Sequence, residues 1–486
     1  MSRVLGHTRN FQVVLITILL AFLAFGYYKN LFDTALAIAV LCGFTVLFLL
    51  FVFRFDYYYL LLVALVPISI DMVLVGGAKL NFPSEGLLAI AIPVILFFNK
   101  SCRLGLTKAI LHPITLLIFT WLLIQLITSL LSTHIDVSLK RFVIQLFFVF
   151  GFFGIVHMLK DKHKLSSFYF AYAIGLIPVM YFTIQQHIHF NFQPQVVFAI
   201  CQPYFNDHTV YGACLAFIIP FLFIFLRNAS VTSIQSWKKM GLILLTIVIV
   251  GSEVLALSRA ALLSLVVALF FWVLLYYKVA FKKIIIGVLV LCSSIGVFYD
   301  DIYANIEKNE AVSNDGELIN HFSSVSNIKS DASNLERINR WICAYRMFEE
   351  KPLSGFGPGT YQFEYNRFQT VANKTYISTN AGDRGNAHSE YLSALSEMGL
   401  FGGISFVLIV FTSIYYGMQN HYKGKDPLLK KLNLAALLGL ITYFFHGVFN
   451  AFLDQSKMAF LVFTALAMIV WINQYNEDET VPNKMV

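Results

Sequence analysis

The sequence predicts an all-α polytopic membrane protein with about 12–14 transmembrane helices and a large extracytoplasmic helical loop. Of its 486 residues, 58% are hydrophobic and only 13% are charged, whereas soluble chains average about 45–50% and about 25%. Apolar runs long enough to cross the hydrocarbon layer as helices recur along the whole chain. These runs do not alternate in hydrophobicity every second residue, which excludes the strands of a membrane barrel.

The chain divides into a first transmembrane bundle (1–299), a loop (300–390), three last spans (391–473) and a cytoplasmic tail (474–486). Because no small-residue cleavage site follows the first apolar run, we expect a retained span there and not a signal peptide. The expected spans are 11–28, 31–53, 57–75, 84–99, 112–131, 139–159, 166–185, 209–226, 240–256, 260–277, 281–299, 391–418, 431–450 and 456–473.

The distribution of lysine and arginine predicts the orientation. If the N-terminus is cytoplasmic, the inner segments hold twenty Lys and Arg residues and the short outer loops hold six. Short cytoplasmic loops carry such an excess, so both termini are expected inside and the 300–390 loop outside. The net charge of +8 therefore follows from topology and does not indicate a nucleic-acid partner.

The six cysteines are scattered and show no metal-binding spacing. Most are expected to be small buried side chains in the bundle. Cys201 and Cys343 both fall in segments placed outside, so a disulfide between them remains open.

The 300–390 loop carries nine Lys/Arg against thirteen Asp/Glu residues, so it is not a generic basic surface for acidic lipid. Residues 311–333 are rich in Ser, Asn and Asp, which predicts coil. A helix is expected over 334–350, ending before Pro352, and a second over 360–371. The apolar face of the first is expected at spacings of three and four, at Ile338, Trp341, Ile342, Tyr345 and Phe348.

Four arginines are candidates for binding an anionic substrate. Arg259 lies in a tight turn between two spans at the outer surface, where it either anchors the helix at the interface or faces an anionic group. Arg337 precedes Trp341 by four residues and is expected on the buried side of the loop helix. Arg340 and Arg346 are expected to point elsewhere, with Glu336 among the acidic residues that could pair with them.

Histidines and polar residues at the outer ends of spans complete the candidate site. His388 precedes the 391–418 span, where it either caps the helix or accepts a proton from a hydroxyl group. His446, Asn450 and Asp454 follow one another at spacings of four, which would place them on one helix face. Lys140 and Arg141 begin a span on the same side, and no metal-binding motif occurs in the loop.

Three motifs in this order resemble the O-antigen ligase and polymerase family. They are SRAALL after one span, R-x-x-x-W followed by KPLSGFGPGTYQF, and AHSEYLSALSEMGLFGG entering the next span. The resemblance covers about 250–415, and the first 200 residues match only as a multi-span pattern. The residue after the histidine is Ser389, where the family has asparagine.

The resemblance implies an enzyme of the bacterial inner membrane with its site facing the periplasm. It implies metal-independent, inverting transfer of a glycan from an undecaprenyl-diphosphate carrier, without a cofactor. Arg259 and Arg337 match the diphosphate-binding arginines, and His388 matches the essential histidine. The expected substrate-binding residues are Arg340, Arg141, Lys140, Trp341, Gly357, His446 and Asn450.

The acceptor stays open at this point. A ligase uses lipid A-core, a polymerase uses a second lipid-linked repeat unit, and a related protein O-oligosaccharyltransferase uses Ser or Thr. Ligase is favoured because the motifs flanking the loop are of that type. A transporter is the least favoured class, because its polar residues would run through the whole bundle and its sequence would show internal repeats.

Overall fold

The protein is described from a computed structural model. It describes residues 45–51, 53–73, 79–98, 109–154, 162–228, 236–297, 332–369 and 385–480, together with Gly43 and Val156. The chain forms two compact units, Met1–Val63 and Ala64–Val486, and the candidate site lies wholly in the second. The predicted spans 11–28 and most of 31–53, and the predicted coil at 311–333, lie outside the described residues or at their edge.

Eight helices of the described residues are long and apolar enough to cross a membrane, which confirms the predicted fold class. A helix satisfies its own backbone groups in lipid, and this is why such apolar runs become helices. The eight are α6 (Pro113–Leu130), α7 (Ile135–Phe148) with its π-helical continuation η1 (Val149–Gly154), α8 (Lys162–His189), α9 (His208–Asn228), α11 (Arg259–Tyr276), α17 (Glu390–Lys423), α18 (Pro427–His446) and α19 (Ser456–Thr480).

Four further helices match predicted spans in position: α3 (Phe55–Leu65), α4 (Ser84–Phe98), α10 (Ser236–Leu255) and α12 (Phe281–Val297). The predicted span 57–75 is wrong in its second half. The helix ends at Leu65, and β1 (Ile70–Val73) pairs antiparallel with β2 (Lys79–Phe82). Ile70 and Val73 are β-branched residues that favour a strand, but the apolar run before them hides the change from helix to strand.

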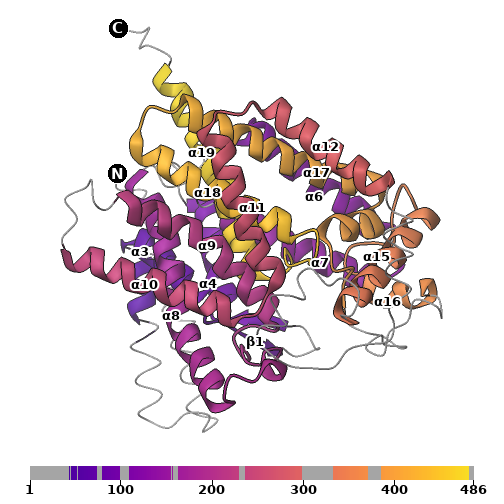
Figure 1. Cartoon of the computed structure of the whole chain (residues 1–486), viewed down its shortest axis with the longest axis horizontal. Helices are drawn as coiled ribbons and strands as arrows, with labels where there is room; N and C mark the ends of the chain where they lie inside the picture. Colours follow the sequence, from indigo (N-terminus) through magenta and orange to yellow (C-terminus); the bar gives the residue numbers. More distant parts are fainter. Residues whose placement is uncertain are drawn as a thin grey trace. The chain divides into compact units, whose positions relative to one another are not determined.

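The centre of the second unit is made by α9, α18 and α19, which are the most enclosed of the eight. α18 packs against α9, α11 and α19, and α17 packs against α6 (Figure 1). Asn433 on α18 donates to the carbonyl of Gly417 on α17 at 2.8 Å, and Asn420 donates to that of Ile469 on α19 at 2.9 Å. Polar side chains inside the bundle thus fix neighbouring helices to one another.

The segment between α12 and α17 contains α15 (Ala332–Glu350), α16 (Tyr361–Glu364) and the 3₁₀ turn η3 (Tyr365–Phe368), which confirms both predicted loop helices. α15 and α16 lie beside the beginning of α17 (Figure 1). The predicted apolar face of α15 is wrong, because its members are at most half-buried and Tyr345 is 55% exposed. The buried residues are Glu336, Asn339, Arg340, Cys343, Ala344 and Met347. Hydropathy misplaces this face because a buried ion pair lies on it.

Cys201 and Cys343 are both buried free thiols, so no disulfide joins them. Cys343 packs with Met347, Phe356 and Tyr361 in the core of the loop. Burial raises the pKa of the Cys343 thiol to about 11 and that of Cys201 to about 12. Both therefore serve as apolar packing groups.

The turn at 352–360 docks α15 onto the membrane helices. Gly357 N–H donates to the Glu397 carbonyl at 2.8 Å, and the Phe356 carbonyl accepts from Thr133 N–H at 3.1 Å. α17 is kinked at Gly399, whose φ is 66°, and a Cβ there would lie 2.4 Å from the Leu353 carbonyl oxygen. The turn therefore lies between the α6–α7 connection and the kink in α17.

Candidate functional site

His388, His446 and Arg259 lie at the ends of helices that meet at one end of the bundle. Glu390 N–H, at the start of α17, donates to the Gly447 carbonyl just after α18 at 2.8 Å. A Cβ on Gly212, in the first turn of α9, would lie 2.9 Å from the Cβ of Ser258, just before α11. The end of α18 and the starts of α9, α11 and α17 therefore belong to one region.

His388 occupies a short loop directly before α17. Its φ of 47° is in the left-handed region, and its N–H donates to Asn386 Oδ1 at 2.9 Å. Its carbonyl accepts from Trp341 Nε1 on α15 at 3.1 Å. The side chain that caps α17 is Ser389, which accepts from Leu392 N–H. His388 is therefore not the helix cap, and Ser389 serves in a capping position that asparagine would also suit.

Arg340 holds the His388 loop in place. Its Nη1 donates to the Asn386 carbonyl at 3.2 Å, and its Nε donates to Glu336 at 2.9 Å in a buried ion pair. Asn386 Nδ2 in turn donates to the Ala451 carbonyl at 3.0 Å. The expectation that Arg340 points away from the buried side is wrong, since only 5% of the residue is exposed. This pairing favours a positioning role, and the predicted substrate contact of Arg340 stays a prediction.

The environment of His388 favours the neutral imidazole. Burial lowers its pKa to about 4, and the positive charges of Arg340 and Arg337 act in the same direction. A hydrogen bond with Asn450 and the negative charge of Asp207 raise the pKa of His388, but these two effects are smaller. At neutral pH, His388 therefore carries no charge and can accept a proton.

Arg337, His446 and Asn450 lie around His388. The charge of Arg337 acts on both histidines, and Arg337 itself is half-buried. His446 is buried, and among the described residues neither of its ring nitrogens has a hydrogen-bond partner. The same holds for Asn450 Nδ2. His446 ends α18 and Asn450 lies beyond it, so they are not on one continuous helix face, although both reach this cluster.

Arg259 begins α11 and is half-buried. Leu257, two residues earlier, has a φ of 49°. This left-handed backbone conformation forms the tight turn between α10 and α11. The neighbouring Ser258 approaches the first turn of α9, the helix that follows Asp207. The structure thus places Arg259 at the same end of the bundle as His388, and its contact with diphosphate stays a prediction.

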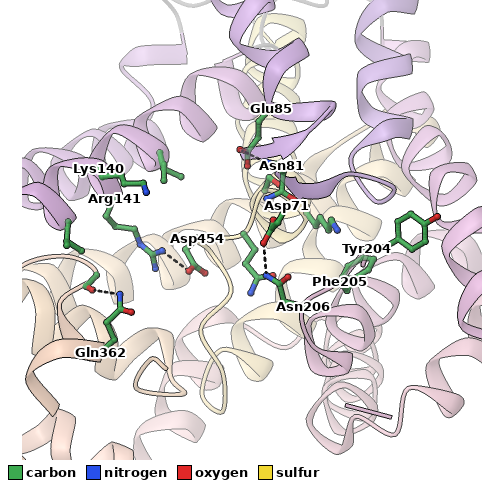
Figure 2. A pocket seen from close by; sticks show the side chains of 16 residues that line it. Asp71, Asn81, Glu85, Lys140, Arg141, Tyr204, Phe205, Asn206, Gln362 and Asp454 are labelled. Carbon is green, nitrogen blue, oxygen red and sulfur yellow. Dashed lines mark hydrogen bonds and ion pairs between the residues drawn. The ribbon is translucent and has the colours of Figure 1, made fainter. Parts of the chain in front are cut away.

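A cavity of about 480 Å³ is lined by Lys140 and Arg141 of α7, and Asp454, four residues after Asn450, lines it too. Arg141 Nη1 bonds Asp454 Oδ2 at 2.6 Å. Figure 2 shows Arg141 pointing toward Asp454, while Asn206 and Asp71 meet on another part of the wall. The cavity therefore brings together two of the predicted substrate-binding residues.

Trp341 and Gly357 both contact other parts of the protein in ways that fix its structure. Trp341 supports the His388 carbonyl, as described above. A Cβ on Gly357 would lie 2.0 Å from Ser132 Oγ, and its φ of 110° favours glycine. These contacts explain both residue types without a ligand, and their predicted contacts with substrate stay predictions.

Two acidic residues at this site are not among the site residues that the sequence predicts. Glu390 Oε1 accepts from Tyr443 Oη at 2.7 Å and from the N–H groups of Phe452 and Leu453 at 2.6 and 2.8 Å, so it fixes the 447–455 loop. Asp207 accepts from Thr209 N–H at 2.8 Å and pairs with His208. The only sequence signal was an acidic residue at a helix start, which is common at helix caps.

Among the described residues, no three His, Cys, Asp or Glu side chains lie together as a metal site. The predicted metal independence is a statement about the reaction and stays a prediction.

Comparison with known proteins supports the resemblance found in the sequence. Residues 242–407 match the O-antigen ligase family, and this is the part of the chain that carries the three motifs. A segment of 134 residues is 24% identical to an uncharacterized protein of Haemophilus influenzae. That segment covers 28% of this chain and 33% of the relative, so the chain spans about a third of the curated relative that it matches.

Proposed function

Because this multi-pass membrane chain carries an O-antigen ligase family domain at residues 242–407, we propose that it is a glycan ligase. It takes a glycan from an undecaprenyl-diphosphate carrier and joins it to a hydroxyl of lipid A-core, at the periplasmic face of the bacterial inner membrane. The observation that carries the proposal is a neutral, half-buried histidine whose loop is held between α15 and the 450–451 segment, with Arg337 nearby.

The reaction requires one base and a stabilised leaving group. The acceptor oxygen forms a bond to the anomeric carbon as the bond from that carbon to the diphosphate oxygen breaks. His388 takes the proton of the acceptor hydroxyl, and undecaprenyl diphosphate leaves with the electron pair. Because attack and departure occur on opposite faces, the anomeric configuration inverts.

Arginines suit the leaving group because a guanidinium offers several fixed donors to phosphate oxygens. Arg337 is placed by α15, whose position is fixed through Arg340 and Trp341. Arg259 lies at the same end of the bundle, and we propose that both arginines bind the diphosphate. Charge builds on the diphosphate as it departs, so donors fixed in advance lower the barrier.

The donor also adjusts the base. In the free protein, Arg340 and Arg337 help to hold the pKa of His388 down at about 4. A bound diphosphate brings negative charge beside these arginines, which favours the protonated imidazole and raises that pKa. His388 therefore becomes a stronger base when the donor is bound, which links proton transfer to donor binding.

The proposal is tested with purified protein, glycan-loaded carrier and lipid A-core, in a buffer that contains EDTA. His388→Ala should slow transfer by about 10²–10⁴-fold, the range for loss of a general base, and should keep donor binding close to wild type. Arg259→Ala should weaken binding of undecaprenyl diphosphate, and Arg259→Lys should slow transfer by about 10²–10³-fold, the range for loss of one preorganised donor.

Transfer by His388→Ala at the wild-type rate would exclude His388 as the base. Transfer that stops in EDTA and returns with Mg²⁺ would exclude the metal-independent mechanism. If the wild-type protein transfers only to a second lipid-linked repeat unit or to protein Ser or Thr, it is a polymerase or a protein O-oligosaccharyltransferase that uses the same chemistry.

A further inference from the structure

The cavity lined by Lys140 and Arg141 has a wall that carries both hydrogen-bond donors and hydrogen-bond acceptors. Four amide side chains line it: Asn81, Asn206, Gln362 and Gln455. An amide both donates and accepts, as a sugar hydroxyl does. The aromatic rings of Tyr204 and Phe205 line the same wall and give it an apolar surface. A polar ligand with many hydroxyls and some C–H surface matches this combination.

The charges of the wall balance. Lys140, Arg141 and Lys457 face three carboxylates, those of Asp71, Glu85 and Asp454. Arg141 already bonds Asp454 at 2.6 Å, so its guanidinium is partly occupied. A diphosphate in this cavity would meet as many negative as positive side chains. The cavity is therefore poorly suited to the anionic part of the donor and better suited to an uncharged polar ligand.

Lys457 gives the cavity a buried donor. Lys457 is only 4% exposed, and its Nζ lies 4.3 Å from the centroid of the Phe205 ring. Within the part of the chain that the structure describes, Lys457 forms no ion pair. Buried ammonium groups need hydrogen-bond acceptors, and the oxygen atoms of a saccharide can supply them.

Two segments join the cavity to His388. Tyr204, Phe205 and Asn206 line the cavity, and the next residue is Asp207, whose charge acts on His388. Asp454 to Lys457 line it too, and they follow the Asn450–Ala451 pair that contacts His388 and its loop. Both segments that line the cavity therefore lead directly into residues that act on His388 or hold its loop.

We propose that this cavity is a saccharide subsite, which binds an uncharged sugar unit of a glycan substrate while the diphosphate lies outside it. The proposal rests on the proposed function for the identity of the glycan. The sugar belongs either to the donor glycan, next to the diphosphate, or to the acceptor, and the same hydrogen-bonding chemistry serves both.

The test measures binding to the full-length protein in nanodiscs with three probes: undecaprenyl diphosphate without sugar, the glycan-loaded carrier, and lipid A-core. Gln362→Ala and Asn206→Ala each remove an amide from a different segment of the wall. Each should weaken binding of one glycan-bearing probe by about 2- to 12-fold, the range for one neutral hydrogen bond. Gln185→Ala is the matched control, because Gln185 is exposed on α8 and does not line the cavity.

Weaker binding of the glycan-loaded carrier alone would assign the subsite to the donor, and weaker binding of lipid A-core alone would assign it to the acceptor. Weaker binding of the sugar-free carrier would overturn the proposal, because the cavity would then hold the diphosphate. Binding of all three probes at the level of the control would overturn it as well. Since binding is measured without turnover, a wild-type protein that binds glycan but transfers none would contradict the proposed function alone.

Discussion

Two arginines three residues apart on α15 have different surroundings. Arg340 is buried in contacts with Glu336 and the Asn386 carbonyl, and the ring of Tyr365 lies 5.1 Å from its guanidinium carbon. Arg337 is half-buried, and its charge reaches both His388 and His446. We therefore expect Arg340 to position the histidine loop and Arg337 to meet the substrate.

The surroundings of His388 predict the pH dependence of transfer. The value of kcat/KM reports the free enzyme, in which the pKa of His388 lies at about 4. Below that pH the imidazole is protonated and cannot accept a proton, so kcat/KM should rise from acid pH and level off above about 4 to 5. The acid limb of kcat should lie at higher pH, because the bound diphosphate favours the protonated imidazole.

Arg337→Gln provides the check on this assignment. The substitution removes a positive charge near His388, so the acid limb of kcat/KM should move to higher pH while the rate falls. Arg346→Gln is the control, since Arg346 bonds the Phe368 carbonyl and is not among the charges that act on His388. An acid limb at pH 6.5 or above in the wild-type protein would contradict the depressed pKa.

At the scale of elements, the position of α15 depends on the turn that follows it. Gly355 has a φ of 62°, and a Cβ there would lie 2.3 Å from the Glu397 carbonyl carbon. Leu400 N–H donates to the Pro352 carbonyl at 2.7 Å, where the kink in α17 frees this N–H from its own helix. The turn and the kink thus form one joint between the loop that carries α15 and the membrane helices.

This joint predicts the effect of adding a single methyl group. Gly355→Ala should lower the thermal midpoint of the purified protein and reduce transfer, because left-handed backbone costs about 1–2 kcal/mol for an L-residue and the new Cβ also meets α17. Gly241→Ala is the matched control. Gly241 lies inside α10 with nothing within 4 Å of a new Cβ, so the change should be neutral or stabilise by about 0.5–1 kcal/mol. Equal midpoints for the two variants would show that the joint does not hold the loop.

The sequence predicts elements better than contacts here. Hydropathy places the spans and both loop helices well, since lipid demands long apolar helices. It fails at 57–75, where a strand hairpin follows a short helix, and on α15, where the buried face carries Glu336 and Arg340. The family motifs mark His388 and Arg337, but Asp207 and Glu390 enter the site through contacts between distant segments, which no local pattern reveals.

At the scale of the whole molecule, the proposed base and cavity gather at one end of the bundle. Arg141 in the middle of α7 bonds Asp454 just before α19, and the 447–455 loop contacts the start of α17 through Glu390. A cavity at the membrane surface can admit a lipid carrier from the side and a sugar from water. If the carrier enters from the side, the catalytic residues must lie at one face of the membrane. The hydrocarbon chain of the carrier then stays among the transmembrane helices.

The excess of twenty over six basic residues predicts which face this is. We expect alkaline phosphatase fused after Asn334 to be active and a fluorescent protein fused at the C-terminus to fold, because the first reporter requires the periplasm and the second the cytoplasm. A fusion of each reporter at the other position is the matched control and should be silent. Phosphatase activity at the C-terminus with fluorescence at Asn334 would invert the orientation. The proposed site would then face the cytoplasm, where it could not receive a carrier presented at the outer leaflet.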